Sequence, residues 1–100
     1  MGFYDSKRWL SLRESILRRD RYTCQENARF GKMREATTVH HIFPREEFPE
    51  YEWKPWNLIS LTAEAHNMMH TREGELTAKG KDLLRRTARK NNVEIPERYK

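Results

Sequence analysis

The spacing of hydrophobic residues changes along the chain, and each spacing predicts a different element. Between residues 6 and 19, Trp9, Leu12 and Ile16 recur at intervals of three and four residues, which predicts an amphipathic helix. Asp5 or Ser6 can cap this helix, because a side-chain oxygen there can accept a hydrogen bond from a free amide of the first turn. We expect the helix to bury one apolar stripe and to expose its arginines.

Two runs predict short strands, the first of them rich in β-branched residues. Residues 37–42 are Thr-Thr-Val-His-His-Ile, and Pro44 follows shortly after them. Residues 56–61 form the second run, and the loop of residues 45–55 between the runs mixes glutamates with aromatic residues. Two short strands joined by one loop most simply form an antiparallel hairpin.

Two more helices are predicted after the hairpin. The first has Ser60 or Thr62 as its N-cap and continues to the break at Gly74. The second is basic and covers about residues 77–90. Residues 21–36 have no clear period and are expected to form a knuckle-like turn.

The charge is distributed unevenly. One hundred residues suit a single domain, and 36% hydrophobic against 35% charged residues predicts a compact core under a heavily charged surface. The net charge is +4 over residues 1–36, −4 over residues 37–76 and +5 over residues 77–100. Such basic segments attract phosphate groups, in a way that weakens with salt. From charge alone, a solvated basic surface is an equally good interpretation.

Membrane and secretory features are weak or missing. No run approaches the roughly 20 apolar residues needed to cross a bilayer, and the first residues contain no apolar secretory segment. Gly2 and Ser6 fit the loose myristoylation pattern, but the chain has no other membrane-binding feature. The single cysteine, Cys24, excludes an internal disulfide and a site built from several thiolates.

All four histidines lie within residues 40–70. His66 and His70 are four apart in the predicted helix, which places both rings on one face, as two ligands of one metal ion require. Neighbouring strand residues point to opposite faces, so His40 and His41 can share a site only where the regular strand ends. One of them could then bind metal while the other, with an ordinary pKa near neutrality, takes a proton from water. Asn57 could orient that base, although a turn residue is the simpler interpretation.

Together these residues resemble the HNH motif. His40-His41, Asn57 and His66-x-x-x-His70 are similar to the ββα-metal finger of colicin nuclease domains, homing endonucleases and phage HNH proteins. The segment Phe3–Asp20 also resembles small phage and bacterial HNH proteins.

The resemblance implies an α+β fold in one domain over residues 1–100. Its core, residues 37–71, would be a ββα-metal finger: a two-stranded antiparallel hairpin plus a helix. An N-terminal helix at about residues 6–19 and a basic C-terminal helix at about residues 77–90 would flank this core.

The resemblance also implies a role for each residue. His41 corresponds to the general base and Asn57 to the asparagine that positions the base loop. His40, His66 and His70 correspond to ligands of one divalent ion, which could be Mg, Mn, Ni or Zn. The implied function is a cytoplasmic, metal-dependent HNH endonuclease, from a phage or its bacterial host, that hydrolyses phosphodiester bonds in DNA. Double-stranded DNA is the expected partner, the phage packaging machinery is a further candidate, and no membrane partner is expected.

One feature of many relatives is missing. They bind a structural zinc through two Cys-x-x-Cys pairs, whose positions correspond here to Cys24 and Asn27 and to Thr62 and Ala65. Three of the four thiolates are absent, so we predict no structural zinc. Side-chain packing is expected to hold the knuckle instead, with these candidates: Tyr22, Phe30, Met33, Met68 and Met69.

The basic C-terminal helix is the predicted DNA-binding surface. The residues expected to contact phosphates are Lys81, Arg85, Arg86 and Arg89. Two other functions are compatible with the sequence: a non-catalytic DNA-binding or packaging-accessory module that keeps the fold, and a small metal-binding domain that mediates protein interactions.

Overall fold

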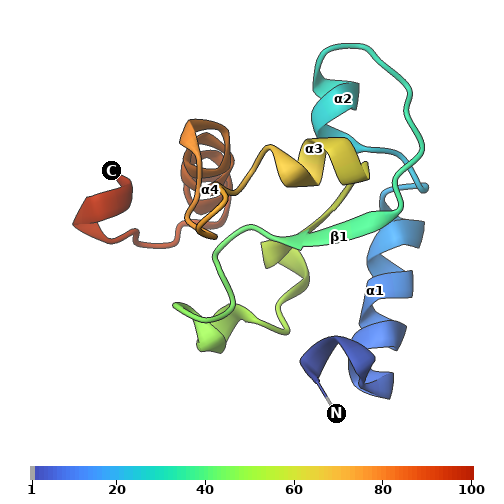
Figure 1. The fold of residues 1–100 in the computed structure, drawn as a ribbon, viewed down its shortest axis with the longest axis horizontal. Helices are drawn as coiled ribbons and strands as arrows, with labels where there is room; N and C mark the ends of the chain where they lie inside the picture. Colours follow the sequence, from blue (N-terminus) through green and yellow to red (C-terminus); the bar gives the residue numbers. More distant parts are fainter. Residues whose placement is uncertain (1) are drawn as a thin grey trace.

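A two-stranded antiparallel hairpin forms the centre of the fold (Figure 1). The computed structural model describes residues 2–100. Strand β1 (Thr38–His41) pairs with β2 (Leu58–Leu61), so that His41 lies opposite Leu58. Helix α3 (Ala63–Asn67) follows β2 directly, and the Thr62 side chain caps it by accepting a hydrogen bond from the Ala65 amide. The predicted α+β class, with a hairpin followed by a helix, is confirmed.

The remaining helices surround this hairpin. Helix α1 (Lys7–Arg19) lies at one end and α4 (Ala78–Asn91) at the other, while α2 (Gln25–Arg29) lies beside α3 (Figure 1). The described residues also include four short 3-10 helices: η1 (Phe3–Asp5), η2 (Pro49–Tyr51), η3 (Pro55–Asn57) and η4 (Glu97–Tyr99). No helix of the described residues combines the length and apolarity that a membrane crossing needs.

Helix α1 is fastened at both ends. At its start, Ser6 Oγ accepts a hydrogen bond of 3.1 Å from the Trp9 amide, which satisfies one of the free amides of the first turn. At its end, the Asp20 carboxylate accepts a hydrogen bond of 3.0 Å from the Ser60 amide of β2. The buried stripe between these ends therefore lies against the hairpin, with Trp9 buried as the spacing predicts.

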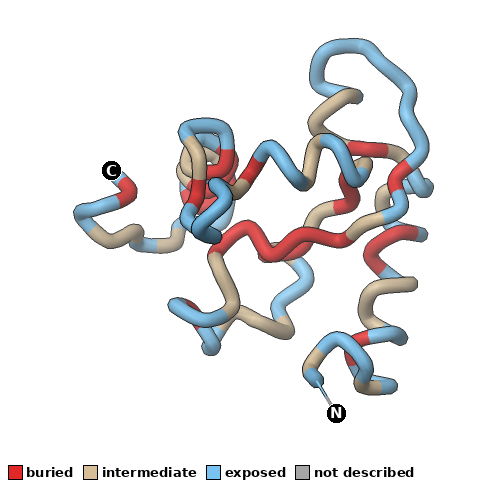
Figure 2. The backbone as a smooth tube through the Cα atoms, in the orientation of Figure 1, coloured by how far each residue is buried: buried red, intermediate tan, exposed pale blue. Residues whose placement is uncertain are grey.

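The core has two parts. The smaller lies between α1 and the hairpin and consists of Trp9, Ile16, Leu17, Ala36, Val39 and Leu58. The larger joins α4 to the loop after β1 and includes Phe43, Phe48, Leu61, Met69, Leu83, Leu84 and Tyr99. Figure 2 shows β1 buried along most of its length between these parts, whereas the loop after α2 is exposed.

The segment between α1 and β1 differs from the expectation. It contains the short helix α2, and backbone hydrogen bonds close it, from the Cys24 amide to the Arg34 carbonyl and from the Ala36 amide to the Tyr22 carbonyl. The expected side-chain packing was largely wrong, because Phe30 is 72% exposed and Met33 is 76% exposed. Tyr22 and Met68 are also exposed, and only Met69 of the five candidates is buried.

The C-terminal residues pack against the domain. Tyr99 is buried in the larger core, and its hydroxyl donates a hydrogen bond of 2.5 Å to Glu47 Oε1. The Arg85 guanidinium donates a hydrogen bond of 2.9 Å to the Tyr99 carbonyl. These contacts tie the end of the chain to α4 and to the loop that follows β1.

Candidate active site

Three histidines form a cluster that suits a metal ion. Ligand atoms of His40, His66 and His70 all lie within 4.8 Å of one another. His40 Nε2 is buried and has no hydrogen-bond partner among residues 2–100. A buried polar atom without a partner is costly, and a bound cation would satisfy it. Burial, and then the neighbouring His66 and His70, hold the pKa of His40 well below its ordinary value, so its imidazole is in the neutral form that binds metal.

His70 reaches this cluster by a different route from the one expected. Helix α3 ends at Asn67, so His66 and His70 do not share a helix face; His70 instead forms a β-bridge with Leu76. Thr77 accounts for the early end, because its hydroxyl donates to the Met68 carbonyl at 2.6 Å and its amide to the Met69 carbonyl at 2.9 Å. The start of α4 thus takes the carbonyl groups that a longer α3 would have used.

His41 lies beside the cluster but outside it. Its Nε2 is 3.0 Å from the Glu52 carbonyl oxygen, which can only accept a hydrogen bond, so Nε2 carries the proton. The unprotonated Nδ1 is 3.5 Å from the Tyr4 hydroxyl. The Trp9 ring stacks on the imidazole with a centroid separation of 5.2 Å and an interplanar angle of 21°. Both the tautomer and the orientation of the ring are therefore defined by its neighbours.

The surroundings of His41 favour its neutral form. Burial is the largest influence and lowers its pKa; the Glu52 carbonyl opposes this, and the positive charge of Arg45 lowers the pKa further. The net result is a pKa below the ordinary value for histidine. A neutral imidazole with a free nitrogen is the state that a general base requires.

Asn57 is fully buried under the loop that carries Glu52. Its Oδ1 accepts a hydrogen bond of 2.7 Å from the Phe43 amide, and its Nδ2 donates to the carbonyls of Phe43 and Tyr51, both at 3.2 Å. The amide therefore joins the two ends of the loop, and none of these hydrogen bonds goes to the His41 ring. Because Tyr51 precedes Glu52, these bonds fix the carbonyl that holds His41 Nε2.

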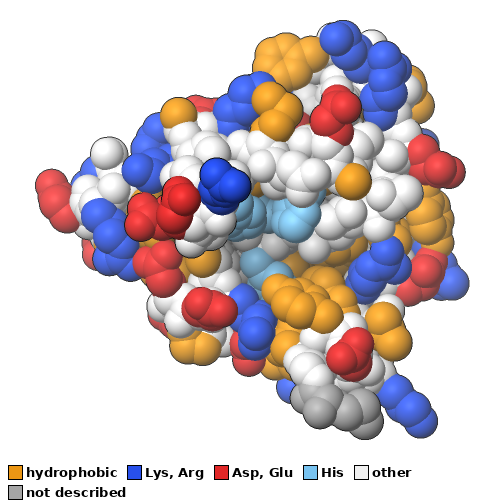
Figure 3. Space-filling model, viewed as in Figure 1, with side chains coloured by type: hydrophobic (Ala, Val, Ile, Leu, Met, Phe, Trp, Pro, Cys, Tyr) orange, Lys and Arg blue, Asp and Glu red, His pale blue; other side chains and the backbone are white. Residues whose placement is uncertain are grey.

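A cavity of about 710 Å³ contains the four histidines. They gather in a hollow at the centre of one face, next to a hydrophobic surface (Figure 3). Sequence reasoning missed three other residues that line it: Tyr4, Arg13 and Arg45. No local pattern could have placed them there, since Tyr4 and His41 are 37 residues apart.

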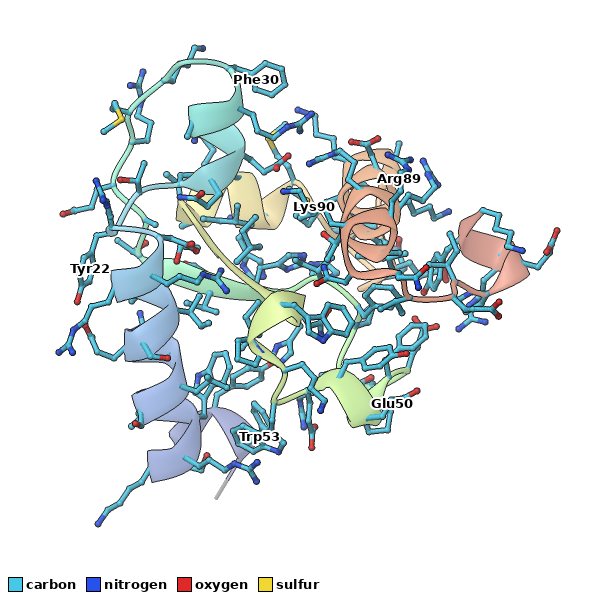
Figure 4. The ribbon with its side chains drawn as sticks, turned by 180° about the vertical axis from the view of Figure 1, so that it is seen from behind. Tyr22, Phe30, Glu50, Trp53, Arg89 and Lys90 are labelled. Carbon is cyan, nitrogen blue, oxygen red and sulfur yellow. The ribbon has the colours of Figure 1, made fainter. Side chains whose placement is uncertain are left out.

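None of the basic residues predicted to bind DNA from α4 lines the histidine cavity. The Arg85 guanidinium is bound to the Tyr99 carbonyl, and Arg86 forms ion pairs with Asp82 at 2.8 Å and Glu26 at 3.1 Å. Two further residues line separate depressions: Lys81 near Glu47, and Arg89 in a groove floored by hydrophobic residues. Figure 4, drawn from the side opposite the histidine face, shows Arg89 on α4.

The fold and the histidine cluster define the class of protein: a small α+β chain with the hairpin-and-helix arrangement of HNH endonucleases. No family model and no curated protein matches the chain. Among solved structures, it is similar to the HNH endonuclease of the deep-sea thermophilic bacteriophage GVE2, determined with manganese ion. The two are 34% identical with a TM-score of 0.63, over 65% of this chain and 71% of the phage enzyme. The chain belongs to the HNH endonuclease family.

Proposed function

We propose that the protein is a metal-dependent endonuclease that hydrolyses phosphodiester bonds in DNA. One observation carries this proposal: a neutral imidazole with a free Nδ1 lies in the same cavity as three clustered histidines, one of which has a buried, unpartnered nitrogen. A general base next to a divalent-ion site is a combination that can catalyse hydrolysis of a phosphodiester bond by water.

His40, His66 and His70 would hold the metal ion. All three have pKa values lowered by burial, so their imidazoles are available as ligands near neutral pH. A divalent ion bound there would polarise the scissile phosphate and stabilise negative charge on the leaving oxygen. The manganese ion in the GVE2 enzyme structure supports a divalent ion, and imidazole ligands are compatible with several such ions.

His41 would act as the general base through Nδ1. Its Nε2–H remains bonded to the Glu52 carbonyl, which holds the ring while Nδ1 takes a proton from the attacking water. Asn57 would support this geometry indirectly, through its bonds to Phe43 and Tyr51 of the loop. Loss of Asn57 should therefore impair the orientation of the base and the stability of the loop together.

DNA is the proposed substrate because of the charge distribution and the walls of the cavity. Arg13 and Arg45 line the cavity and would meet the phosphates next to the cleaved bond. Arg45 lies 3.4 Å from Glu52 and its guanidinium is stacked over the Phe3 ring, so its position is defined before DNA binds. The α4 residues Lys81, Arg85, Arg86 and Arg89 remain our proposal for more distant phosphates.

A plasmid-nicking assay tests the proposed activity. Supercoiled DNA is incubated with the wild type and with His41→Ala, separately in Mg²⁺, Mn²⁺, Ni²⁺ or Zn²⁺. We expect nicking by the wild type with at least one ion and a loss of at least about 100-fold in the variant. Equal nicking by the two proteins, or none with any ion, would contradict the proposal. DNA binding without nicking would favour the non-catalytic module.

The α4 contacts need a separate binding assay. Charge reversal at Lys81, Arg85, Arg86 or Arg89 should weaken DNA binding and make log Kd less dependent on log salt, by roughly one for each phosphate that the variant no longer binds. Arg13→Glu and Arg45→Glu provide the comparison at the cavity wall. An unchanged salt slope in the α4 variants would remove these residues from the binding surface.

A further inference from the structure

The N-terminal 3-10 helix η1 contributes Tyr4 to the lining of the histidine cavity, although it lies far outside the ββα core in sequence. Ser6 holds it in place, because its Oγ donates a hydrogen bond of 2.8 Å to the Phe3 carbonyl while accepting one from the Trp9 amide. The Phe3 ring packs against Trp53 with a centroid separation of 4.5 Å. Figure 4 shows Trp53 beside this end of the molecule. The segment is thus fixed both to α1 and to the loop that carries Glu52.

These contacts direct Tyr4 toward the base. Its ring packs edge-on against Phe3 at 5.0 Å and against Trp9 at 5.3 Å, yet the residue is 51% exposed and lines the cavity. Its hydroxyl is 3.5 Å from His41 Nδ1, the only polar neighbour within hydrogen-bonding range that the described residues offer it. A phenylalanine would make the same ring contacts, so the hydroxyl contributes only at Nδ1.

The distance between the Tyr4 hydroxyl and His41 Nδ1 is long for a direct hydrogen bond. A good hydrogen bond between a hydroxyl and a ring nitrogen spans about 2.7–3.0 Å, so the two groups are in weak direct contact. One water oxygen can lie about 2.8 Å from both of them. Because Nδ1 has no proton, such a water must donate to it. Its second proton can then point to the Tyr4 oxygen, which leaves a lone pair free to face the cavity.

We propose that the Tyr4 hydroxyl positions the attacking water at His41 Nδ1. The inference rests on the proposed function, since it takes His41 as the base. As the water oxygen bonds to phosphorus, one water proton passes to Nδ1 and the bond from phosphorus to the leaving oxygen breaks. The other proton stays on the new phosphate oxygen, and the leaving oxygen takes a proton from solvent. Tyr4 is unchanged, so its role is to position the water.

The test compares Tyr4→Phe with Tyr22→Phe, a matched substitution at an exposed tyrosine that does not line the cavity. Steady-state cleavage of a DNA duplex is measured with the ion that gives the most nicking, next to wild type and His41→Ala. We expect Tyr4→Phe to lower kcat about tenfold, as for loss of one transition-state hydrogen bond of about 1.4 kcal/mol. KM and the melting temperature should stay at wild-type values, and Tyr22→Phe should behave like the wild type.

Three results would overturn the inference. A kcat for Tyr4→Phe within twofold of the wild type would show that the hydroxyl has no part in the reaction. A faster variant would mean that Tyr4 obstructs the base, and a raised KM with unchanged kcat would mean that it only binds DNA. If His41→Ala is inactive while Tyr4→Phe is normal, only the role of Tyr4 fails. An inactive wild type would refute both proposals.

Discussion

Replacing Asn57 with alanine should destabilise the protein strongly, because this one amide joins both ends of the loop between the strands. The substitution removes the partner of the Phe43 amide and the partner of the Phe43 carbonyl. The Tyr51 carbonyl loses a bond from Asn57 but keeps one of 3.1 Å from the Lys54 amide. Two buried backbone groups are therefore left without a partner.

The size of the effect follows from these contacts. A buried polar group that loses its partner costs about 1–3 kcal/mol, so two such groups cost about 2–6 kcal/mol. The total free energy of unfolding of a domain of this size is roughly 5–15 kcal/mol. We expect the free energy of unfolding to fall by about 3 kcal/mol and the melting temperature by roughly 12–24 °C.

Urea unfolding followed by tryptophan fluorescence measures this change. Asn91→Ala is the matched control, because the Asn91 amide makes one hydrogen bond, of 2.9 Å, to the Thr87 carbonyl at the exposed end of α4. The control should lose less than about 1 kcal/mol. If the free energy of unfolding falls no more in Asn57→Ala than in Asn91→Ala, the bonds from Asn57 to the loop do not stabilise the fold as we argue.

Three more predictions concern packing and metal. Gly80→Ala should lower the free energy of unfolding, measured in urea, by about 1–3 kcal/mol, because the new Cβ would lie 2.5 Å from the Met69 carbonyl oxygen. This clash should outweigh the better helix propensity of alanine, and a stabilised variant would contradict the prediction. His66→Ala should weaken Mn²⁺ binding, measured by calorimetry, by on the order of 10–100-fold or more; unchanged affinity would place the metal elsewhere. With His40, His66 and His70 all replaced by alanine, elemental analysis should find no retained zinc, whereas a full equivalent would refute the predicted lack of a structural zinc site.

Polar side chains occupy two of the four positions that correspond to zinc-binding cysteines in relatives. Cys24 is buried, and its Sγ accepts a hydrogen bond of 3.1 Å from Asn27 Nδ2. Burial raises the pKa of the thiol, but hydrogen bonds with Asn27 and Thr62 outweigh it and lower the pKa overall. Asn27, one of the two polar replacements, thus bonds to the remaining cysteine. Together with the backbone bonds from the Cys24 amide to the Arg34 carbonyl and from the Ala36 amide to the Tyr22 carbonyl, this bond closes the segment around α2.

Local physical rules were enough to predict several elements from the sequence. Spacing of three and four residues identifies α1, and a capping serine marks its start, because both signals depend on neighbours within one turn. The β-branched run at residues 37–42 and the strand-like run at residues 56–61 likewise predicted the hairpin. The five-residue helix α2 was not predicted, since it has no buried residue and therefore no hydrophobic period.

The arrangement of the site was decided partly by sequence and partly by tertiary contacts. The histidines and Asn57 could be named from residue types and spacing, because the chemistry of metal binding and proton transfer restricts which side chains can serve. The folded chain shows that Asn57 bonds to the loop, as the resemblance implied, and only the folded chain shows that His70 arrives from a β-bridge. It also brings Tyr4 and Arg45 to the base and leaves the basic residues of α4 outside the cavity. These features depend on contacts between residues far apart in the chain, and no local pattern encodes such contacts.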